Sequence, residues 1–225
     1  MPGIPLFLVG SGFIGGSILM ALIQEGKHEI AVLCRDEKKA ETLKGLGVKP
    51  VMGTLDSEDV IAKETANSDI VRSRSFFGRG WGPFNKISIQ IPGWIKESVR
   101  EKRVISHGPE KFWNNISIKN LVPGYLTLLA HMEKTQEPPL YVFCETGCHQ
   151  WGPAGAHLDK LLKARGLVSQ DLIEDPNPSM ETACGTMSRS KAELLREWGW
   201  EAHDTQTLEQ SMEEDIDFMR AEKLI

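Results

Sequence analysis

A glycine-rich turn near the N-terminus most constrains what this chain can fold into. Gly10, Gly12 and Gly15 have the spacing G-x-G-x-x-G. The apolar residues 6–9 precede the turn, as in a buried strand, and apolar residues recur at helical spacing from Ile14 onward. In such a strand–turn–helix unit, one glycine makes the tight turn, one lets the backbone approach a pyrophosphate, and one packs the helix against the strand. The helix N-terminus adds free amides and a positive dipole. The motif in this context predicts a dinucleotide-binding unit.

The residue that follows the second expected strand (residues 29–34) indicates which dinucleotide the site would bind. An acid at this point would hold the ribose hydroxyls, whereas an arginine accommodates the 2′-phosphate of NADP. Arg35 therefore favours NADP(H), with an ordinary surface charge as the alternative. We expect Asp36 to cap the following helix rather than to bind ribose. The expected cofactor-binding residues are Gly10, Ser11, Gly12, Phe13, Ile14, Gly15 and Arg35.

The order of predicted elements indicates one half of a doubly wound α/β fold. Polar residues 72–75 then interrupt the pattern, and the glycines and prolines of residues 78–83 predict a loop. We therefore expect a Rossmann-type half over residues 1–75 and a substrate-binding portion over residues 76–225, within one compact unit. In the first half we expect, besides the first strand–helix–strand unit, helices at 37–46 and 57–66 and strands at 48–52 and 68–71.

The C-terminal portion is expected to be a small α/β arrangement. The whole fold is then a truncated Rossmann-like doubly wound parallel sheet with this portion appended. Its expected helices are at 91–100, 121–134, 153–166, 188–199 and 208–222, its strands at 113–118 and 140–144, and its long loop at 171–186.

Composition excludes several classes of partner. The 225 residues are 40% hydrophobic and 25% charged, which is ordinary for a globular protein. A net charge of -5 and a pI near 5.7 argue against nucleic acid or an anionic membrane as the main partner. The sequence shows neither a leader pattern nor an apolar run of membrane-spanning length, so we expect a soluble cytoplasmic protein.

One cysteine–histidine cluster invites a zinc hypothesis. It contains Cys144, Cys148 and His149, with His157 nearby. Structural zinc usually needs a second well-spaced pair of ligands, and only Cys184 is left to complete it. We therefore expect no metal, and reduced cysteines.

Several motifs in order resemble one known group of enzymes. The chain resembles the extended and atypical short-chain dehydrogenases/reductases, the NAD-dependent epimerase/dehydratase and NmrA-like group, and its mixture of motifs resembles fungal members. The resemblance covers nearly the whole chain. The motifs that carry it are GSGFIGG at 10–16, Arg35, GTLD at 53–56, FGRG at 77–80, GPFN at 82–85, WNNI at 113–116, SRSKA at 188–192 and LREWGW at 195–200.

The resemblance also implies an internal truncation. Between residues 71 and 76 the usual members carry two further strand–helix units, which hold the catalytic serine and a Tyr-x-x-x-Lys pair. Here Tyr125 is followed at the fourth position by Leu129, and Tyr141 by Glu145, so the sequence contains no such pair.

The cofactor site departs from the family pattern as well. The glycine turn is one residue shorter than the usual T-G-x-x-G-x-x-G, and Thr54 stands where the family has the acid on the adenine side. The resemblance therefore leaves open whether a cofactor still binds.

The resemblance places Trp113, Asn114 and Asn115 in the substrate pocket. An asparagine can polarise a carbonyl without transferring a proton, while the alternative is a turn held by side-chain hydrogen bonds. Arg79 completes the expected catalytic set, with a loop surface as its alternative. Further expected pocket residues are Phe77, Trp81, Asn85 and His107, of which the first three lie in the glycine-rich segment and the last is more simply a surface histidine.

Three functions compete on these observations. The favoured hypothesis is a repurposed enzyme of secondary metabolism that needs no cofactor. It would catalyse a non-redox isomerisation or an intramolecular cyclisation, including a Diels–Alder-type [4+2] addition, on a small apolar substrate. The second is an NADP(H)-dependent reductase or epimerase-like enzyme with another acid. The third is an NmrA-like cofactor-sensing pseudoenzyme. A homodimer is expected because the shortened sheet leaves a face and an edge uncovered.

Overall fold

The computed structural model describes residues 4–65, 77–135, 139, 141–178 and 184–225. The chain divides into two compact units. The first comprises Met1–Arg74 and Gly80–Lys86, and the second comprises Ser75–Arg79 and Ile87–Ile225. Residues 80–86, which the sequence assigned to the C-terminal portion, thus group with the nucleotide-binding half.

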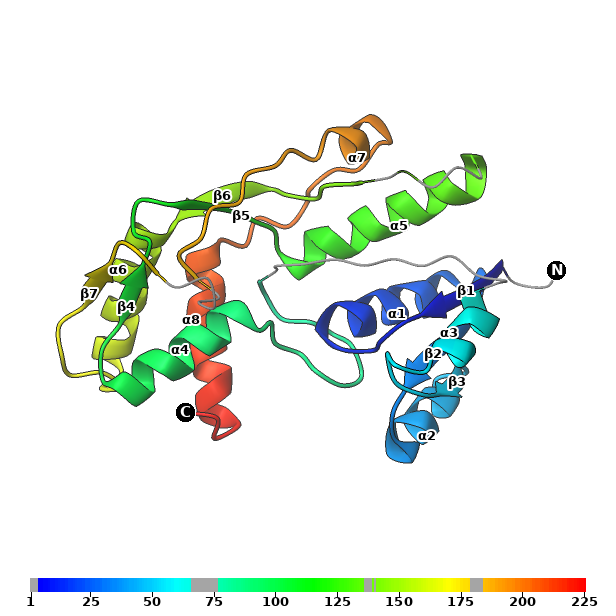
Figure 1. Cartoon of the computed structure of the whole chain (residues 1–225), viewed down its shortest axis with the longest axis horizontal. Coiled ribbons are helices and arrows are strands. Elements are labelled where there is room, and N and C mark those ends of the chain that lie inside the picture. Colours follow the sequence, from blue (N-terminus) through cyan, green and yellow to red (C-terminus); the bar gives the residue numbers. More distant parts are fainter. Residues whose placement is uncertain (1–3, 66–76, 136–138, 140, 179–183) are drawn as a thin grey trace. The chain divides into compact units, whose positions relative to one another are not determined.

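The first unit is an alternating α/β structure, and the α/β Rossmann-like prediction is confirmed for its described residues. Its parallel sheet has the strand order β1-β2-β3 (Figure 1), and the register sets Leu6 opposite Ile30 and Leu33 opposite Val51. The expected fourth strand and the polar residues after it lie outside the described residues. The elements are β1 (Ile4–Leu8), α1 (Phe13–Glu25), β2 (His28–Cys34), α2 (Glu37–Gly45), β3 (Lys49–Met52) and α3 (Glu58–Thr65).

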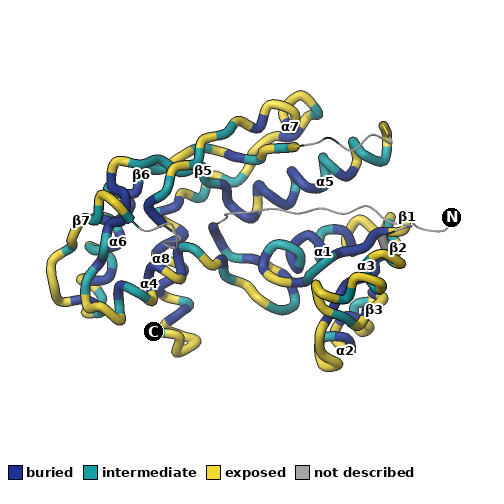
Figure 2. The backbone as a smooth tube through the Cα atoms, viewed as in Figure 1, coloured by how far each residue is buried: buried dark blue, intermediate teal, exposed yellow. Residues whose placement is uncertain are grey.

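Local sequence explains where these elements begin and end. Gly26 ends α1 in the left-handed conformation, with φ 67°, and its amide donates to the carbonyl of Leu22. Asp36 caps α2 by accepting a 2.8 Å hydrogen bond from the amide of Lys39, as expected. Figure 2 shows α2 as mostly exposed. Leu43, on this helix, is fully buried. Helix α2 therefore presents a mostly polar surface to solvent.

In its described residues the second unit contains helices around two short strand pairs. Helices α4, α6 and α8 pack against one another, β4 pairs in parallel with β7, and β5 pairs antiparallel with β6 (Figure 1). The elements are α4 (Gln90–Glu101), β4 (Ile105–His107), β5 (Phe112–Asn115), α5 (Ile118–Thr135), β6 (Gly147–Gln150), α6 (Trp151–Ala164), β7 (Ile173–Asp175), α7 (Glu193–Glu197) and α8 (Leu208–Ala221).

Trp151 is the centre of the second unit's core. Its side chain is fully buried, and its indole N–H donates to the carbonyl of Thr186 at 2.9 Å. The rings of Trp94, Trp113 and His149 surround it, at 5.7, 6.0 and 4.5 Å between ring centres. Aromatic side chains bury large apolar areas in such edge-to-face contacts.

One strand prediction and one loop prediction in this unit are wrong. Residues 141–144 form no strand, and Tyr141 and Phe143 are 73% and 56% exposed. The strand is instead β6, because the antiparallel pairing sets the polar residues from Gly147 onward opposite β5. The expected loop at 171–186 contains β7, whose backbone pairs with β4 although its residues lack a strand pattern.

The helix expected at 188–199 is also shorter than predicted. Ser188 accepts from the amide of Asn114 and donates to the carbonyl of Phe112, each at 2.9 Å. This bridge keeps residues 188–192 extended beside β5, and α7 begins only at Glu193. Tertiary pairing therefore overrides local helix propensity here. Within the described residues, no helix is long and apolar enough to cross a membrane.

Candidate nucleotide-binding site

The glycine turn between β1 and α1 has the geometry that the motif requires. Gly10 has φ 124°, a conformation that favours glycine. A Cβ on Gly15 would lie 2.2 Å from the carbonyl oxygen of Gly10, so the turn and the helix are in direct backbone contact. A Cβ on Gly12 would meet nothing within 4 Å, so the turn is open on that side.

The helix N-terminus faces this open side without a side-chain cap. Gly12 occupies the N-cap position of α1 and has no side chain to accept from the first amides of the helix. An anion at this position would therefore meet unsatisfied amides and the positive end of the helix dipole.

A cavity of about 680 Å³ begins at this turn. Residues from the end of β2, from the turn after β3 and from the segment Gly80–Lys86 complete its lining. The lining residues are Val9, Gly10, Ser11, Gly12, Leu33, Cys34, Arg35, Lys39, Gly53, Thr54, Leu55, Asp56, Phe84 and Asn85.

Two cations lie on the lining of this cavity. Arg35 is exposed at the end of β2. The ammonium of Lys39 lies 3.7 Å from the carboxylate of Asp36 and 5.5 Å from the ring centre of Phe84. Exposed cations beside a ribose site attract a phosphate ester, and arginine also binds it with two parallel hydrogen bonds.

The turn after β3 is fixed by local hydrogen bonds. Gly53 donates its amide to the carbonyl of Cys34 at 3.0 Å, and Thr54 donates its amide to Oγ of Ser57 at 3.0 Å. The hydroxyl of Thr54 accepts from the amide of Asp56 at 3.2 Å. Thr54 therefore stabilises the turn, and Asp56 is the acid that lines the cavity at this side.

These features fit a phosphorylated dinucleotide. The open glycine turn offers room and amides for a pyrophosphate, and the cationic edge at Arg35 and Lys39 offers charge for a ribose phosphate. Of the predicted cofactor residues, Gly10, Ser11, Gly12 and Arg35 line the cavity. Phe13, Ile14 and Gly15 belong to the first turns of α1 and support the turn from behind.

Sequence reasoning missed Phe84 as part of this site. The cation–π contact with Lys39 joins residues that are 45 positions apart, so no local sequence pattern predicts it. Asn85, which was expected in a substrate pocket, lines this cavity.

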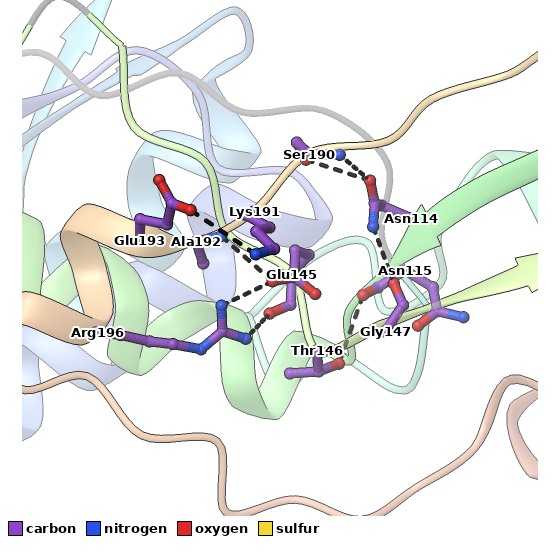
Figure 3. A network of polar contacts seen from close by, with 10 residues as sticks. All are labelled: Asn114, Asn115, Glu145, Thr146, Gly147, Ser190, Lys191, Ala192, Glu193 and Arg196. Carbon is purple, nitrogen blue, oxygen red and sulfur yellow. Dashed lines mark hydrogen bonds and ion pairs between the residues drawn. The ribbon is translucent and has the colours of Figure 1, made fainter.

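Asn114 forms a structural hydrogen-bond network in the second unit (Figure 3). Its side-chain oxygen accepts from the amide of Ser190 and, at 3.3 Å, from the Ser190 hydroxyl, and its nitrogen donates to the carbonyl of Gly147 at 3.1 Å. Asn115 Nδ2 lies 3.3 Å from Nδ1 of His149. These contacts match the alternative of side chains that hold the local backbone.

Glu145 holds the neighbouring part of the same network (Figure 3). Its carboxylate accepts from the amide of Ala192 at 3.2 Å and from Nη1 of Arg196 at 2.8 Å. The pair fixes the extended segment that precedes α7.

Arg79 and Phe77 lie in the second unit. Phe77 is buried in its core. The guanidinium of Arg79 lies 3.7 Å from the ring centre of Phe218, donates to the carbonyl of Glu214 at 3.1 Å, and lies 3.9 Å from Asp215. Trp81, in contrast, is 40% exposed and belongs to the first unit. The structure thus distributes the expected substrate residues over both units.

His107 is not the surface histidine that we favoured. It lies in β4 with 9% of its surface exposed, and its Nδ1 is 2.8 Å from Oδ2 of Asp175. This hydrogen bond lowers the pKa of the Asp175 carboxyl. The parallel pairing of β4 with β7 brings the two side chains together.

His149 is half-buried, with its ring edge-on to Trp151. Burial lowers its pKa to about 4, although the carboxylate of Glu209 opposes the shift. All four cysteines are free, and the described residues contain no group of three His, Cys, Asp or Glu side chains placed to hold a metal.

Comparison with curated proteins finds two partial sequence relatives. The chain is 38% identical to an uncharacterized protein of Schizosaccharomyces pombe over 72 residues, which span 32% of this chain and 24% of that protein. It is 32% identical over 62 residues to the 4-hydroxy-2-methyl-3-oxo-4-farnesyl-3,4-dihydroquinoline-1-oxide ketoreductase of Stigmatella aurantiaca, spanning 28% of this chain and 18% of that enzyme. No family model matches the sequence.

Comparison with solved structures shows the fold. UDP-glucose 4-epimerase of Stenotrophomonas maltophila, with bound NAD, matches with a TM-score of 0.61, 13% identity and 98% coverage of each chain. RMD of Pseudomonas aeruginosa, complexed with NADPH, matches with a TM-score of 0.51, 14% identity, and 97% and 99% coverage. The chain therefore has the Rossmann-like α/β fold of these structures.

Proposed function

We propose that this chain binds NADP(H) in the cavity of its first unit. The observation that carries the proposal is the meeting, in one cavity, of an open glycine turn, an uncapped helix N-terminus and the cations of Arg35 and Lys39. The glycine turn binds the pyrophosphate, and the two cations bind the 2′-phosphate. The ketoreductase relative and the structures solved with NAD or NADPH support this assignment over the hypothesis of a protein without a cofactor.

When bound, NADP(H) supplies a hydride donor or acceptor. The residues of this chain bind and orient its adenosine half. Protonation of a carbonyl would need a positioned acid, and neither tyrosine supplies one in the family's manner. Burial and the nearby Cys144 raise the pKa of Tyr125, and Tyr141 is 73% exposed without a lysine four residues on. We therefore place cofactor binding and sensing first.

An NADP(H)-dependent reductase is the second candidate. It is supported by the partial match to a ketoreductase and by the similarity of the fold to epimerases. This function requires an acid other than a Tyr-x-x-x-Lys pair.

The non-redox cyclase or isomerase ranks below both. Asn114 and Asn115 would have to polarise an apolar substrate, but the hydrogen bonds of Asn114 hold residues 147 and 190. Trp113 packs on Trp151 in the core. A homodimer remains part of the proposal for all three functions, and a small-molecule substrate remains part of it for the two enzymes.

Calorimetric titration of the full chain with NADPH, NADP⁺ and NADH tests this assignment. We expect NADPH to bind more tightly than NADH. Arg35→Ala should weaken NADPH binding about 10-fold or more and leave NADH binding nearly unchanged, because charge-assisted hydrogen bonds to the 2′-phosphate are lost. Lys38→Ala is the matched control, since Lys38 is an exposed neighbour that does not line the cavity. Absence of binding at millimolar cofactor would overturn the proposal.

A further inference from the structure

The glycines of the segment Gly80–Lys86 fit its backbone closely against α1. A Cβ on Gly82 would lie 2.6 Å from the carbonyl carbon of Gly16, and a Cβ on Gly80 would lie 2.9 Å from the ring of Phe13. Neither contact is compatible with a side chain, so both glycines are required for this approach. The glycines of this segment therefore allow its backbone to pack directly against α1, the helix that begins at the cavity.

Hydrogen bonds hold the same segment in place. The amide of Gly80 donates to the carbonyl of Lys86 at 3.0 Å, which closes the segment into a loop. The amide of Trp81 donates to Oγ of Ser17 at 3.3 Å, and this buried hydroxyl donates in turn to the carbonyl of Phe13 at 2.9 Å. The loop is thus attached to the first turns of α1.

Phe84 brings an aromatic ring to the cavity from this attached loop. It is partly exposed and lines the cavity together with residues of the glycine turn and of the turn after β3. Lys39 lies 5.5 Å from its ring centre and 3.7 Å from Asp36, so the ring and the carboxylate together position the ammonium. Because Phe84 is only partly buried and lines the cavity, its ring offers a face to a flat, apolar ligand group.

We propose that Gly80–Lys86 forms the outer wall of the nucleotide site and that Phe84 is the platform on which the adenine ring stacks. This inference rests on the proposed NADP(H) function and adds to it a recognition residue outside the glycine motif. Every base has a π face, so an aromatic platform suits adenine whatever the remainder of the dinucleotide is. Lys39, held over the ring, stays beside the phosphorylated ribose.

We expect Gly80–Lys86 to contact only the adenosine half of the dinucleotide. Substitution of Phe84 should therefore weaken the binding of adenosine 2′,5′-bisphosphate by the same factor as the binding of NADPH. Base–aromatic stacking lost on substitution to alanine corresponds to roughly 5- to 150-fold in affinity.

The experiment is calorimetric titration of the full chain with NADPH and with adenosine 2′,5′-bisphosphate. Phe84→Ala should weaken binding of both ligands by about 10-fold or more. Phe84→Leu, which keeps apolar volume without a π face, should weaken both as well, and Phe84→Tyr should retain wild-type affinity. Trp81→Ala is the control, because Trp81 lies in the same segment, is 40% exposed and does not line the cavity.

Two further outcomes separate this inference from the function on which it rests. Wild-type affinity of Phe84→Leu, with thermal melting unchanged, would overturn the stacking role and leave the NADP(H) proposal standing. Failure of the wild-type chain to bind either ligand would overturn both. Near-ultraviolet circular dichroism of each variant shows whether its fold is retained, and Phe84→Leu decides the question if Phe84→Ala unfolds.

Discussion

Oδ1 of Asp215 lies 3.9 Å from Nη2 of Arg79 inside the second unit, and only 2% of the Asp215 side chain is exposed. In the described part of the chain, Oδ2 of Asp215 and Nη1 of Arg79 have no hydrogen-bond partner. Burial raises the pKa of the carboxyl to about 7, while Arg79 opposes the shift and Glu214 adds to it. The carboxyl is thus incompletely compensated in its charged form.

This pair predicts a pH dependence of stability. The folded state holds the Asp215 proton more tightly than the unfolded chain, whose carboxyl has a pKa near 4. The folded state therefore binds more protons between about pH 4 and pH 7, and stability falls as the pH rises through this window, by about 2–4 kcal/mol from this group. Urea unfolding of the wild type and of Asp215→Asn at several pH values measures the effect, because the neutral amide should remove this part of the slope.

Asp217 on the same helix provides the control for this pH effect. It is exposed and pairs with Arg165 at 3.0 Å. Because exposed ion pairs contribute about 0–1 kcal/mol, Asp217→Asn should leave the slope between pH 4 and pH 7 close to that of the wild type. A slope that survives in Asp215→Asn would contradict the buried-carboxyl explanation.

The glycine turn predicts opposite effects for two alanine substitutions. Gly15→Ala places a Cβ 2.2 Å from the carbonyl oxygen of Gly10, so we expect destabilisation of about 2 kcal/mol or more. Gly12→Ala meets no atom within 4 Å, so its stability should stay within about 1 kcal/mol of wild type while NADPH affinity falls. Thermal melting and calorimetric titration separate the two effects. Equal stability of both variants would contradict the observed packing.

The cationic edge of the cavity predicts a salt-dependent preference for NADPH over NADH. Arg35 and Lys39 both line the cavity, and exposed charges are screened within about 8 Å at physiological ionic strength. Raising salt from 50 mM to 500 mM should reduce NADPH affinity more than NADH affinity. Lys39→Met should lessen this difference, whereas Lys38→Met should not. An NADPH affinity that does not change with salt would argue against phosphate recognition by these side chains.

Asn120, in the second unit, predicts a large stability loss on substitution. Its side-chain oxygen accepts from the amides of His203 and Asp204 at 2.9 and 2.8 Å, and its nitrogen donates to the carbonyl of Asp204 at 2.8 Å. Asn120 is itself buried, and Asn120→Ala leaves these partly buried backbone groups unpaired, so we expect a loss of about 2–4 kcal/mol in chemical unfolding. Asn177→Ala, at an exposed position, should change stability by less than about 0.5 kcal/mol. An Asn120→Ala variant as stable as wild type would contradict this role.

Sequence patterns predicted the first unit well because its structure is locally encoded. The glycine turn, the cap at Asp36 and the alternation of strand and helix each depend on neighbouring residues. In the second unit, the backbone of Ser188 pairs with β5, and β7 forms by pairing with β4. Such long-range pairings leave no periodic signal in the sequence, which explains why the strand at 140–144 and the length of the last helices were predicted wrongly.

The site was predictable only where the motif itself carries the chemistry. Gly10, Gly12 and Arg35 were identified from spacing and charge, and they line the cavity. Phe84 reaches the cavity from a segment that glycine contacts place on α1, and the pairing of β4 with β7 brings Asp175 to His107. Both depend on residues distant in sequence.

The grouping of Gly80–Lys86 with the first unit has a consequence for how the chain can be divided. Along the sequence the backbone passes from one unit to the other after residues 74, 79 and 86, so the units are linked by three covalent crossings rather than one. A fragment cut at residue 75 would omit Phe84, whereas a fragment ending at residue 86 would keep every residue of the cavity lining. Fragments of this protein should therefore be chosen by the compact unit to which each residue belongs. A cut at the point where the α/β alternation first breaks would divide the cavity lining.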